Sequence, residues 1–315
     1  MADNVERNRI LVAVDGSEQA LEAVKYVGAV FPKERTEVVL FNVSSPFSQI
    51  FSELESNPFY QSKTPQLKRW MAEEQSGIGK VMERATRVLH ESGFPETAVK
   101  THCKPKSLGI ARDIVKESYN DYQAVVVGRT GLSRMRDILL KSVAIKLVGY
   151  IKHIPVIVVG GVPVSKRLLV AFDGSQGAMK GVGWVGHLLG GSSCEIVIYS
   201  LVSKNGKFWL GKREYFLPTN VADPVAHARE QLEPIMDQAI DRLLEAGVPA
   251  SQIGSNVVSV DSDRGAFIAE KAAACGFGSV VVGRRGLVSF FEEVFVGRVS
   301  STVLKESDQT AVWVL

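Results

Sequence analysis

Two copies of a glycine turn are the residues of this 315-residue chain whose types and spacing could do chemistry. One copy reads Val-Val-Val-Gly128-Arg-Thr-Gly131, and the other reads Val-Val-Val-Gly283-Arg-Arg-Gly286. A valine triplet is typical of a strand buried inside a parallel sheet. Two glycines that follow it would leave backbone N–H groups bare at the carboxyl end of the strand, where open α/β sheets bind ligands. A lone Gly-x-x-Gly is more often only a flexible turn, but its repetition in the same setting predicts an anion site.

An Asp-Gly-Ser sequence follows the first apolar run of each half, with Asp15 and Ser17 in one half and Asp173 and Ser175 in the other. A carboxylate at such a place could accept hydrogen bonds from a ribose or a base edge. The same residues are equally suited to shaping a turn and capping a helix. Because both aspartates should lie beside the glycine turns at one edge of a sheet, their convergence favours nucleotide binding.

Two other phosphate-binding patterns are excluded. The run from Gly181 to Gly186 matches the dinucleotide fingerprint G-x-G-x-x-G, but it begins some eight residues after the strand and falls inside a predicted helix. We interpret these glycines as sites of close helix packing. Lys141 with the serine after it lacks the preceding glycines of a P-loop, because Leu140 and Met135 occupy those places.

The remaining patterns point to no catalytic or metal centre. The five histidines show no metal-ligand spacing, and no G-x-S-x-G sequence marks an acyl-transfer nucleophile. The three cysteines, at positions 103, 194 and 275, are far apart and odd in number, which is typical of reduced thiols in a cytosolic protein.

The composition is that of an ordinary globular protein, with 45% hydrophobic and 23% charged residues. The net charge of +3 is small, and basic residues are interspersed with acidic ones rather than gathered in blocks, so nothing favours a nucleic-acid partner. No run of about 18 apolar residues predicts a membrane span, and the polar N-terminus does not resemble a secretory signal. We therefore expect a cytoplasmic protein without a membrane partner.

The elements that must position the glycine turns occur twice. Residues 9–17 are repeated 158 residues later as residues 167–175, and the register continues into the predicted strands 37–43 and 195–201. Each half then continues with a long helix, a strand, a second helix, the valine strand and a closing strand. In the first half we expect the long helix at 66–92, the strand at 98–102, the second helix from 110, the valine strand at 125–127 and the closing strand at 155–159. In the second half we expect the same elements, in the same order, at 224–246, 256–260, from 268, 280–282 and 311–315.

This order of elements predicts a duplicated α/β domain with a parallel, doubly wound sheet. We expect the domains to be residues 1–160 and 165–315, joined by a linker at 160–165. The apolar closing strands would be an aggregation hazard if exposed, so we expect them to meet. The halves differ most at 44–65 and 202–223, where aromatic residues either form lids or partner surfaces, or cover the flank of the sheet.

Three pairs of motifs in the two halves resemble the universal stress protein family in its tandem form. They are the Val-Ala-[Val/Phe]-Asp-Gly-Ser openings, the Gly-Arg-[Thr/Arg]-Gly-Leu turns, and the closing Pro-Val-Ile-Val-Val and Ala-Val-Trp-Val. The resemblance covers residues 9–315. It implies two Rossmann-like domains of the adenine nucleotide alpha hydrolase-like type, each with a five-stranded parallel sheet of order 3-2-1-4-5 flanked by helices. Family members usually pair through the fifth strand, and some bind ATP or AMP.

The family motif for nucleotide binding is Gly, two residues, Gly, nine residues, then Gly and Ser or Thr. Carried over to the first half, it implies a site at Ala13, Asp15, Ser17, Val43, Gly128, Arg129, Gly131, Ser142 and Val143. A weaker second site comprises Ala171, Asp173, Ser175, Gly283, Arg284, Gly286, Gly297 and Arg298.

Neither copy of the motif is intact. Lys141 stands where the family has Gly, and Arg298 stands where it has Ser or Thr. Ten residues rather than nine separate Gly286 from Gly297. A side chain in place of the glycine either fills the space of the outer phosphates or turns its charge toward them. The sequence leaves both alternatives open.

The resemblance implies a regulatory module that binds ATP or AMP, with Mg²⁺ only in the case of ATP. No base and nucleophile pair favours a metabolic enzyme. Two alternatives stay open, which are a slow ATP-hydrolysing enzyme and an interaction protein whose two sites are degenerate. We expect an intramolecular pseudo-dimer, either as a monomer or as a dimer of chains, with protein partners that the sequence does not identify.

We expect the first half to be the better site, because it keeps the nine-residue spacing and Ser142. On this hypothesis Gly131→Val removes most adenine-nucleotide binding, whereas Gly286→Val changes little.

Overall fold

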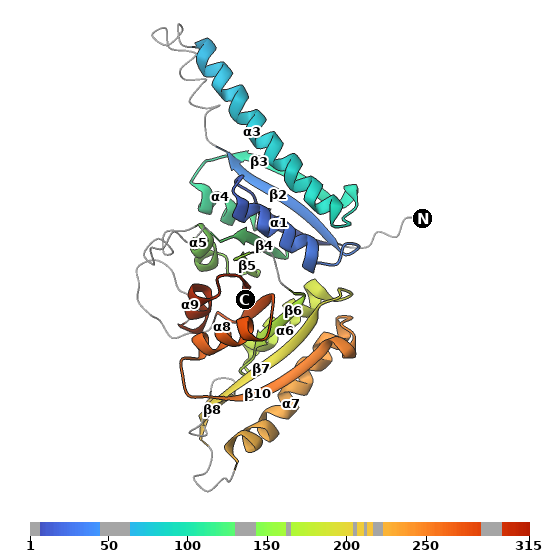
Figure 1. Cartoon of the computed structure of the whole chain (residues 1–315), viewed down its shortest axis with the longest axis vertical. Coiled ribbons are helices and arrows are strands. Elements are labelled where there is room, and N and C mark those ends of the chain that lie inside the picture. The colour runs from blue at the N-terminus through green and yellow to red at the C-terminus, as the bar shows by residue number, and fades with distance from the viewer. Residues whose placement is uncertain are drawn as a thin grey trace.

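The computed structural model describes residues 7–44, 64–129, 143–161, 165–203, 207–210, 213–216, 223–284 and 298–315 (Figure 1). The first half contains five parallel strands in the order β5-β4-β1-β2-β3. These are β1 (Asn8–Ala13), β2 (Thr36–Ser44), β3 (Val99–Pro105), β4 (Ala124–Gly128) and β5 (Val156–Val159). Its α-helices are α1 (Glu18–Val30), α3 (Thr64–Glu91), α4 (Ile110–Glu117) and α5 (Val143–Tyr150).

The second half repeats this arrangement with the order β10-β7-β6-β11-β12. Its strands are β6 (Arg167–Ala171), β7 (Glu195–Ser203), β10 (Ile253–Val260), β11 (Ser279–Val282) and β12 (Ala311–Val314). Its α-helices are α6 (Gln176–Leu189), α7 (Pro224–Glu245), α8 (Arg264–Ala274) and α9 (Arg298–Glu306). Both halves therefore have the expected strand order 3-2-1-4-5, and the predicted fold class is confirmed.

Two details of the second half differ from the sequence prediction. Helix α8 begins at Arg264, four residues before the predicted start at Ile268, because the Asp263 carboxylate accepts the N–H groups of Gly265 and Ala266 and caps the extra turn. A two-stranded antiparallel hairpin, β8 (Lys207–Leu210) and β9 (Arg213–Phe216), lies within the divergent segment 202–223. The remaining residues of the two divergent segments lie mostly outside the described part of the chain.

The two closing strands meet, as expected. Strand β12 pairs antiparallel with β5, so that Val312 faces Val158, Trp313 faces Ile157 and Val314 faces Val156. The two five-stranded sheets thereby become one ten-stranded sheet that runs along the molecule (Figure 1). Pairing satisfies the edge of each closing strand within the chain, which removes the aggregation hazard of two apolar edges.

Helices cover both faces of this sheet. One hydrophobic cluster joins the sheet to α1, α3, α6 and α7, and the other joins it to α4, α5, α8 and α9. Alternate residues of a strand enter opposite clusters, as Ile10 and Leu11 do in β1. Each cluster contains residues of both halves, so the hydrophobic core is continuous across the junction.

The glycines that imitate a dinucleotide fingerprint pack inside helix α6, as interpreted from the sequence. A Cβ at Gly186 would lie 2.7 Å from the Cβ of Ala246, and a Cβ at Gly181 would lie 2.8 Å from Cδ1 of Leu315. Among the described residues no helix is long and apolar enough to cross a membrane, and no cluster of His, Cys, Asp and Glu has the arrangement of a metal site. The cysteines carry free thiols.

Candidate functional site

The Asp-Gly-Ser sequences form the turns from β1 to α1 and from β6 to α6. In the first turn, Oδ1 of Asp15 accepts hydrogen bonds from the backbone N (3.0 Å) and from Oγ (2.6 Å) of Ser17. Ser17 in turn caps α1 by accepting the N–H of Ala20 at 3.1 Å. Gly16 has a φ of 90°, a left-handed conformation that suits glycine. Turn shaping and helix capping are therefore real roles of this sequence.

The second turn has the same construction. Oδ1 of Asp173 accepts the N–H of Ser175 at 3.0 Å, and Ser175 caps α6 by accepting the N–H of Ala178 at 3.0 Å. Gly174 has a φ of 68°. The local sequence thus places an aspartate and the N-terminus of a helix at the same edge of the sheet in both halves.

A pocket of about 320 Å³ opens at this edge in the second half. It lies where β6, β7 and β11 end, between α6 on one face of the sheet and α8 and α9 on the other. Five residues of the predicted second site line it, namely Ala171, Asp173, Ser175, Gly283 and Arg284. The volume is in the range of small-molecule sites, which span roughly 300–1,000 Å³.

The structure adds lining residues that the sequence prediction missed. The most informative are Tyr199, Ser200, Leu201, Arg264 and Ile268, from the end of β7 and the start of α8. The repeat offers a signal for one of them, because a shift of 158 residues takes the predicted site residue Val43 to Leu201. No sequence pattern points to Arg264 and Ile268, because their distance from the end of β6 depends on how α8 packs on the sheet.

Three predicted residues of the second site remain. Gly286 and Gly297 lie outside the described residues. Arg298 is the first residue of α9, and its guanidinium is exposed and 3.4 Å from a carboxylate oxygen of Asp263. In the described structure this arginine therefore faces the start of α8 rather than lining the pocket.

The first half is packed more tightly at the corresponding place. A Cβ built on Gly128 would lie 2.3 Å from the carbonyl oxygen of Gln19, so the backbone of α1 presses against the end of β4. At Gly283 a Cβ would meet no atom of the described residues within 4 Å. Helix α1 therefore occupies the space next to Gly128, whereas no described residue fills the corresponding space next to Gly283.

Other residues of the predicted first site have ordinary surroundings. Ala13, Val43 and Val143 are partly buried and pack against the hydrophobic cluster that includes α4 and α5. Gly131 and Ser142 lie outside the described residues, as does Lys141.

The two loop arginines reach across the junction between the halves. Arg129 is 6% exposed, and its guanidinium donates to backbone carbonyls of Leu304, Lys305 and Ser307 in the second half. The Arg284 guanidinium donates to the carbonyls of Val148 and Val314. Their backbone N–H groups are also engaged, because they extend the pairing of β4 with β5 and of β11 with β12. We predict both as nucleotide-binding residues, and in the structure the Nη donors of both bond to carbonyls within the protein. The buried Nε of Arg284, which also lines the pocket, has no hydrogen-bond partner among the described residues.

Burial changes the acid strength of both arginines. It lowers the pKa of Arg284 to about 10 and also lowers the pKa of Arg129, which the nearby Asp308 carboxylate partly offsets. Both guanidinium groups remain charged at neutral pH. The sequence prediction missed this role because the carbonyls that the arginines reach in the opposite half are some 130 to 180 residues away along the chain.

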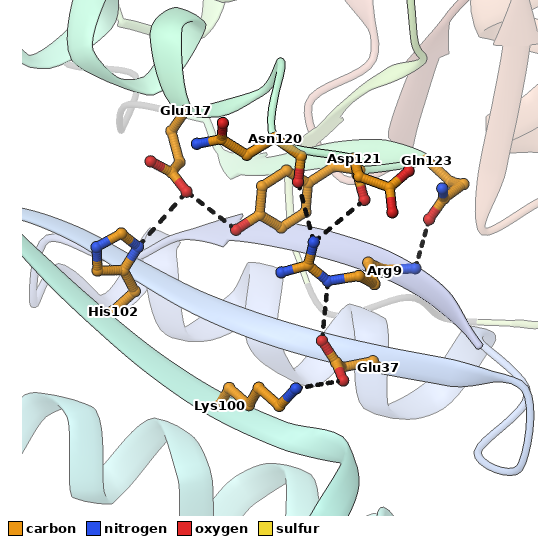
Figure 2. Close-up of polar contacts among 9 residues, drawn as sticks. Arg9, Glu37, Lys100, His102, Glu117, Asn120, Asp121 and Gln123 are labelled. Atoms are coloured by element: carbon orange, nitrogen blue, oxygen red, sulfur yellow. Dashed lines mark hydrogen bonds and ion pairs between the residues drawn. The ribbon is translucent and has the colours of Figure 1, made fainter. Parts of the chain in front are cut away.

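A second polar cluster lies between β1, β2, β3 and the segment after α4 (Figure 2). Arg9 bonds Glu37 at 2.9 Å and the carbonyl of Asn120 at 2.9 Å, and its guanidinium covers the ring of Tyr122 at 4.7 Å. The buried carboxylate of Glu117 accepts the hydroxyl of Tyr122 at 3.2 Å. Burial, followed by the charge of Glu117, raises the pKa of Tyr122 to about 12.

These contacts join β1 to its neighbours. Lys100 and Arg9 together hold the pKa of Glu37 below its usual range, although burial by itself would raise it. His102 completes the cluster with Nδ1 at 3.5 Å from Glu117 (Figure 2). The polar groups of the cluster bond to one another, so the cluster holds the strands and the segment after α4 in place.

Comparison with known proteins agrees with the fold. The model of the universal stress protein family matches residues 6–160 and, a second time, residues 165–314. No curated protein matches the chain. A universal stress protein from Archaeoglobus fulgidus DSM 4304 is 18% identical, with a TM-score of 0.61 over 98% of this chain and 96% of that chain.

Two further structures are similar to the chain. A functionally unknown protein from Pseudomonas aeruginosa PAO1 is 14% identical, with a TM-score of 0.54 over 98% of this chain and 92% of that chain. A universal stress protein solved in complex with cAMP is 18% identical and covers 47% of this chain and 95% of its own, with a TM-score of 0.36. At these identities, the likeness to the first two structures concerns the fold alone.

Proposed function

Because the chain belongs to the universal stress protein family, we propose that it is a regulatory module that binds an adenine nucleotide in the pocket of its second half. The observation that carries the proposal is the open space beside Gly283, in a pocket that also receives Asp173 and the N-terminus of α6. A carboxylate suits ribose hydroxyls, and a helix N-terminus suits phosphate. The family resemblance adds that some members bind ATP or AMP.

The lining of the pocket fits the two parts of such a ligand. Tyr199, Leu201, Ile268 and Val282 offer apolar and aromatic surface for a base. Arg264 lies at the start of α8 and adds a positive charge to the lining. The Asp173 carboxylate and the Ser175 hydroxyl of the lining serve the turn and the helix cap, which favours binding and signalling over catalysis.

Calorimetry with ATP, ADP and AMP, with and without Mg²⁺, tests the proposal. We expect wild-type protein to bind at least one of them, and Gly283→Val to weaken that binding about tenfold or more, because Gly283 lines the pocket and a side chain there would take up room for the ligand. Gly183→Val is the matched control, since Gly183 lies in α6 outside the pocket lining. Absence of binding by all three nucleotides would refute the proposal.

The loop spacing predicts the first half as the better site, whereas the pocket supports the second. The same titrations separate the two hypotheses when Gly131→Val and Gly286→Val are included. If the second half holds the ligand, Gly286→Val weakens binding and Gly131→Val does not. If only Gly131→Val abolishes binding, the nucleotide site lies in the first half. Equal losses of affinity in the two variants would indicate two sites.

A further inference from the structure

Arg129 joins the end of β4 to a helix of the other half. Its guanidinium donates to the carbonyls of Leu304 and Lys305 in the last turn of α9, and to that of Ser307 just beyond it. A carboxylate oxygen of Asp308 lies 3.6 Å away. The last carbonyls of a helix lack partners within it and carry its negative dipole end, so a buried cation satisfies both needs.

Arg284 makes the reciprocal contact. It follows β11, and its Nη1 donates to the carbonyl of Val148 in the last turn of α5, while Nη2 lies 3.4 Å from the carbonyl of Val314. Both arginines thus occupy equivalent places in the duplicated fold, and each binds the C-terminal end of the opposite helix. Helices α5 and α9 both lie at the junction of the two halves (Figure 1).

The connections of the chain make this arrangement a crossed one. Residue 129 begins the segment that leads to α5, and residue 284 begins the segment that leads to α9. Arg129, at the start of the first segment, therefore bonds to α9 at the end of the second segment. Arg284, at the start of the second segment, bonds to α5 at the end of the first. The pocket of the second half is lined by Arg284 and by Val299 of α9, so it contacts both ends of its own segment.

We propose that the two crossed arginines couple the halves, so that adenine-nucleotide binding in the second-half pocket stabilises helix α5 of the first half. This inference rests on the proposed function and adds the regulation of the same site. Helix α5 has eight residues, and helices shorter than about 12–15 residues depend on tertiary contacts for their stability. A ligand that holds the Arg284 side chain in place also holds its hydrogen bond to Val148 in the last turn of α5. Coupling of this kind is reciprocal, so a more stable α5 favours ligand binding.

Hydrogen exchange of the full chain with and without AMP tests the coupling. We expect AMP to slow exchange of the amides of α5 about fivefold in the wild-type protein, together with those of α8, which lines the pocket. Arg284→Lys keeps the charge but loses the two-pronged guanidinium. Because Arg284 also lines the pocket, we expect this variant to bind AMP more weakly, so it is compared at saturating AMP. Under that condition we expect AMP to slow exchange in α8 but no longer in α5.

Two variants complete the experiment. Arg229→Lys changes an exposed arginine on α7 and should leave both effects intact. Arg129→Lys alters the other half and no residue of the pocket lining, yet it releases the last turn of α9, so we expect it to weaken AMP binding severalfold. This second variant also serves if Arg284→Lys does not fold.

The outcomes are distinguishable. If AMP binds but α5 does not respond, or if α5 still responds in Arg284→Lys, the coupling is wrong and the proposed function stands. Unchanged AMP affinity in Arg129→Lys also contradicts the coupling. If calorimetry detects no nucleotide binding to the wild-type protein, the proposed function is wrong and the coupling is wrong with it.

Discussion

Gly128 and Gly283 occupy equivalent places at the ends of the two valine strands, and their surroundings differ. A methyl group at Gly128 would meet the backbone of Gln19 and Ala20, at 2.3 Å from the Gln19 carbonyl oxygen. Backbone atoms of a helix cannot turn aside as a flexible side chain can, so the whole of α1 would have to shift. The same methyl group at Gly283 would lie more than 4 Å from every atom of the described residues apart from its two chain neighbours, so no described residue would have to move.

We therefore expect Gly128→Ala to lower the free energy of unfolding by about 1–3 kcal/mol, the usual cost of overpacking. Gly283→Ala should change it by no more than about 0.5 kcal/mol. Urea unfolding followed by circular dichroism compares the two variants directly. Equal losses of stability would show that the difference in packing between the halves is not present in solution.

At the scale of elements, the entry into α4 depends on one buried carboxylate. Asp113 is 1% exposed and accepts the backbone N–H groups of Ser107 (2.8 Å), Leu108 (3.0 Å) and Gly109 (3.2 Å). It thereby fixes the turn from β3 into the first turn of α4. Burial alone would raise the pKa of Asp113, but the three N–H donors hold it below its usual range.

A lowered pKa in the folded protein means that the Asp113 carboxylate stabilises the fold above its unfolded pKa, near 3.9, and that this stability is lost as the pH falls further. We expect Asp113→Asn to cost about 1–3 kcal/mol at pH 7, because an amide cannot accept all three bonds. The difference in unfolding free energy between wild type and variant should shrink below about pH 4. A difference that stays constant down to pH 2 would contradict this role for Asp113.

At the scale of the whole molecule, the junction of the halves is built like the interior of one domain. The Tyr26 hydroxyl of α1 lies 2.7 Å from Oγ of Ser279 and accepts the indole N–H of Trp313 at 2.7 Å. Phe31 stacks on Trp313 with a centroid distance of 5.8 Å. Tyr26, Phe31 and Trp313 are fully buried. A first-half helix therefore packs into a core that the second half completes.

This packing predicts that the two halves remain together without a covalent link. After insertion of a protease site at residues 162–164 and cleavage, we expect both fragments to elute as one species in size-exclusion chromatography. Their unfolding should stay a single cooperative transition, because each hydrophobic cluster spans the junction. Separation of the fragments under native conditions would show that the linker, rather than the junction, holds the halves together.

The sequence by itself determined the repeat, the alternation of strands and helices, and the strand order that the family resemblance implies. The repeat and the alternation depend on local patterns, such as valine triplets in buried strands and serine caps at the starts of α1 and α6, whereas the strand order came from the resemblance alone. It also predicted that β5 and β12 meet, since two apolar edges need partners.

Only the tertiary structure decided what the loop arginines contact and where the pocket lies. The acceptors of Arg129 and Arg284 are carbonyls, which every residue carries, so no side-chain pattern could identify them. The open space at Gly283 and the packed backbone at Gly128 depend on how closely α6 and α1 approach the sheet. Nearly identical turns thus differ in their packing, because helix positions are set by contacts summed over the whole core.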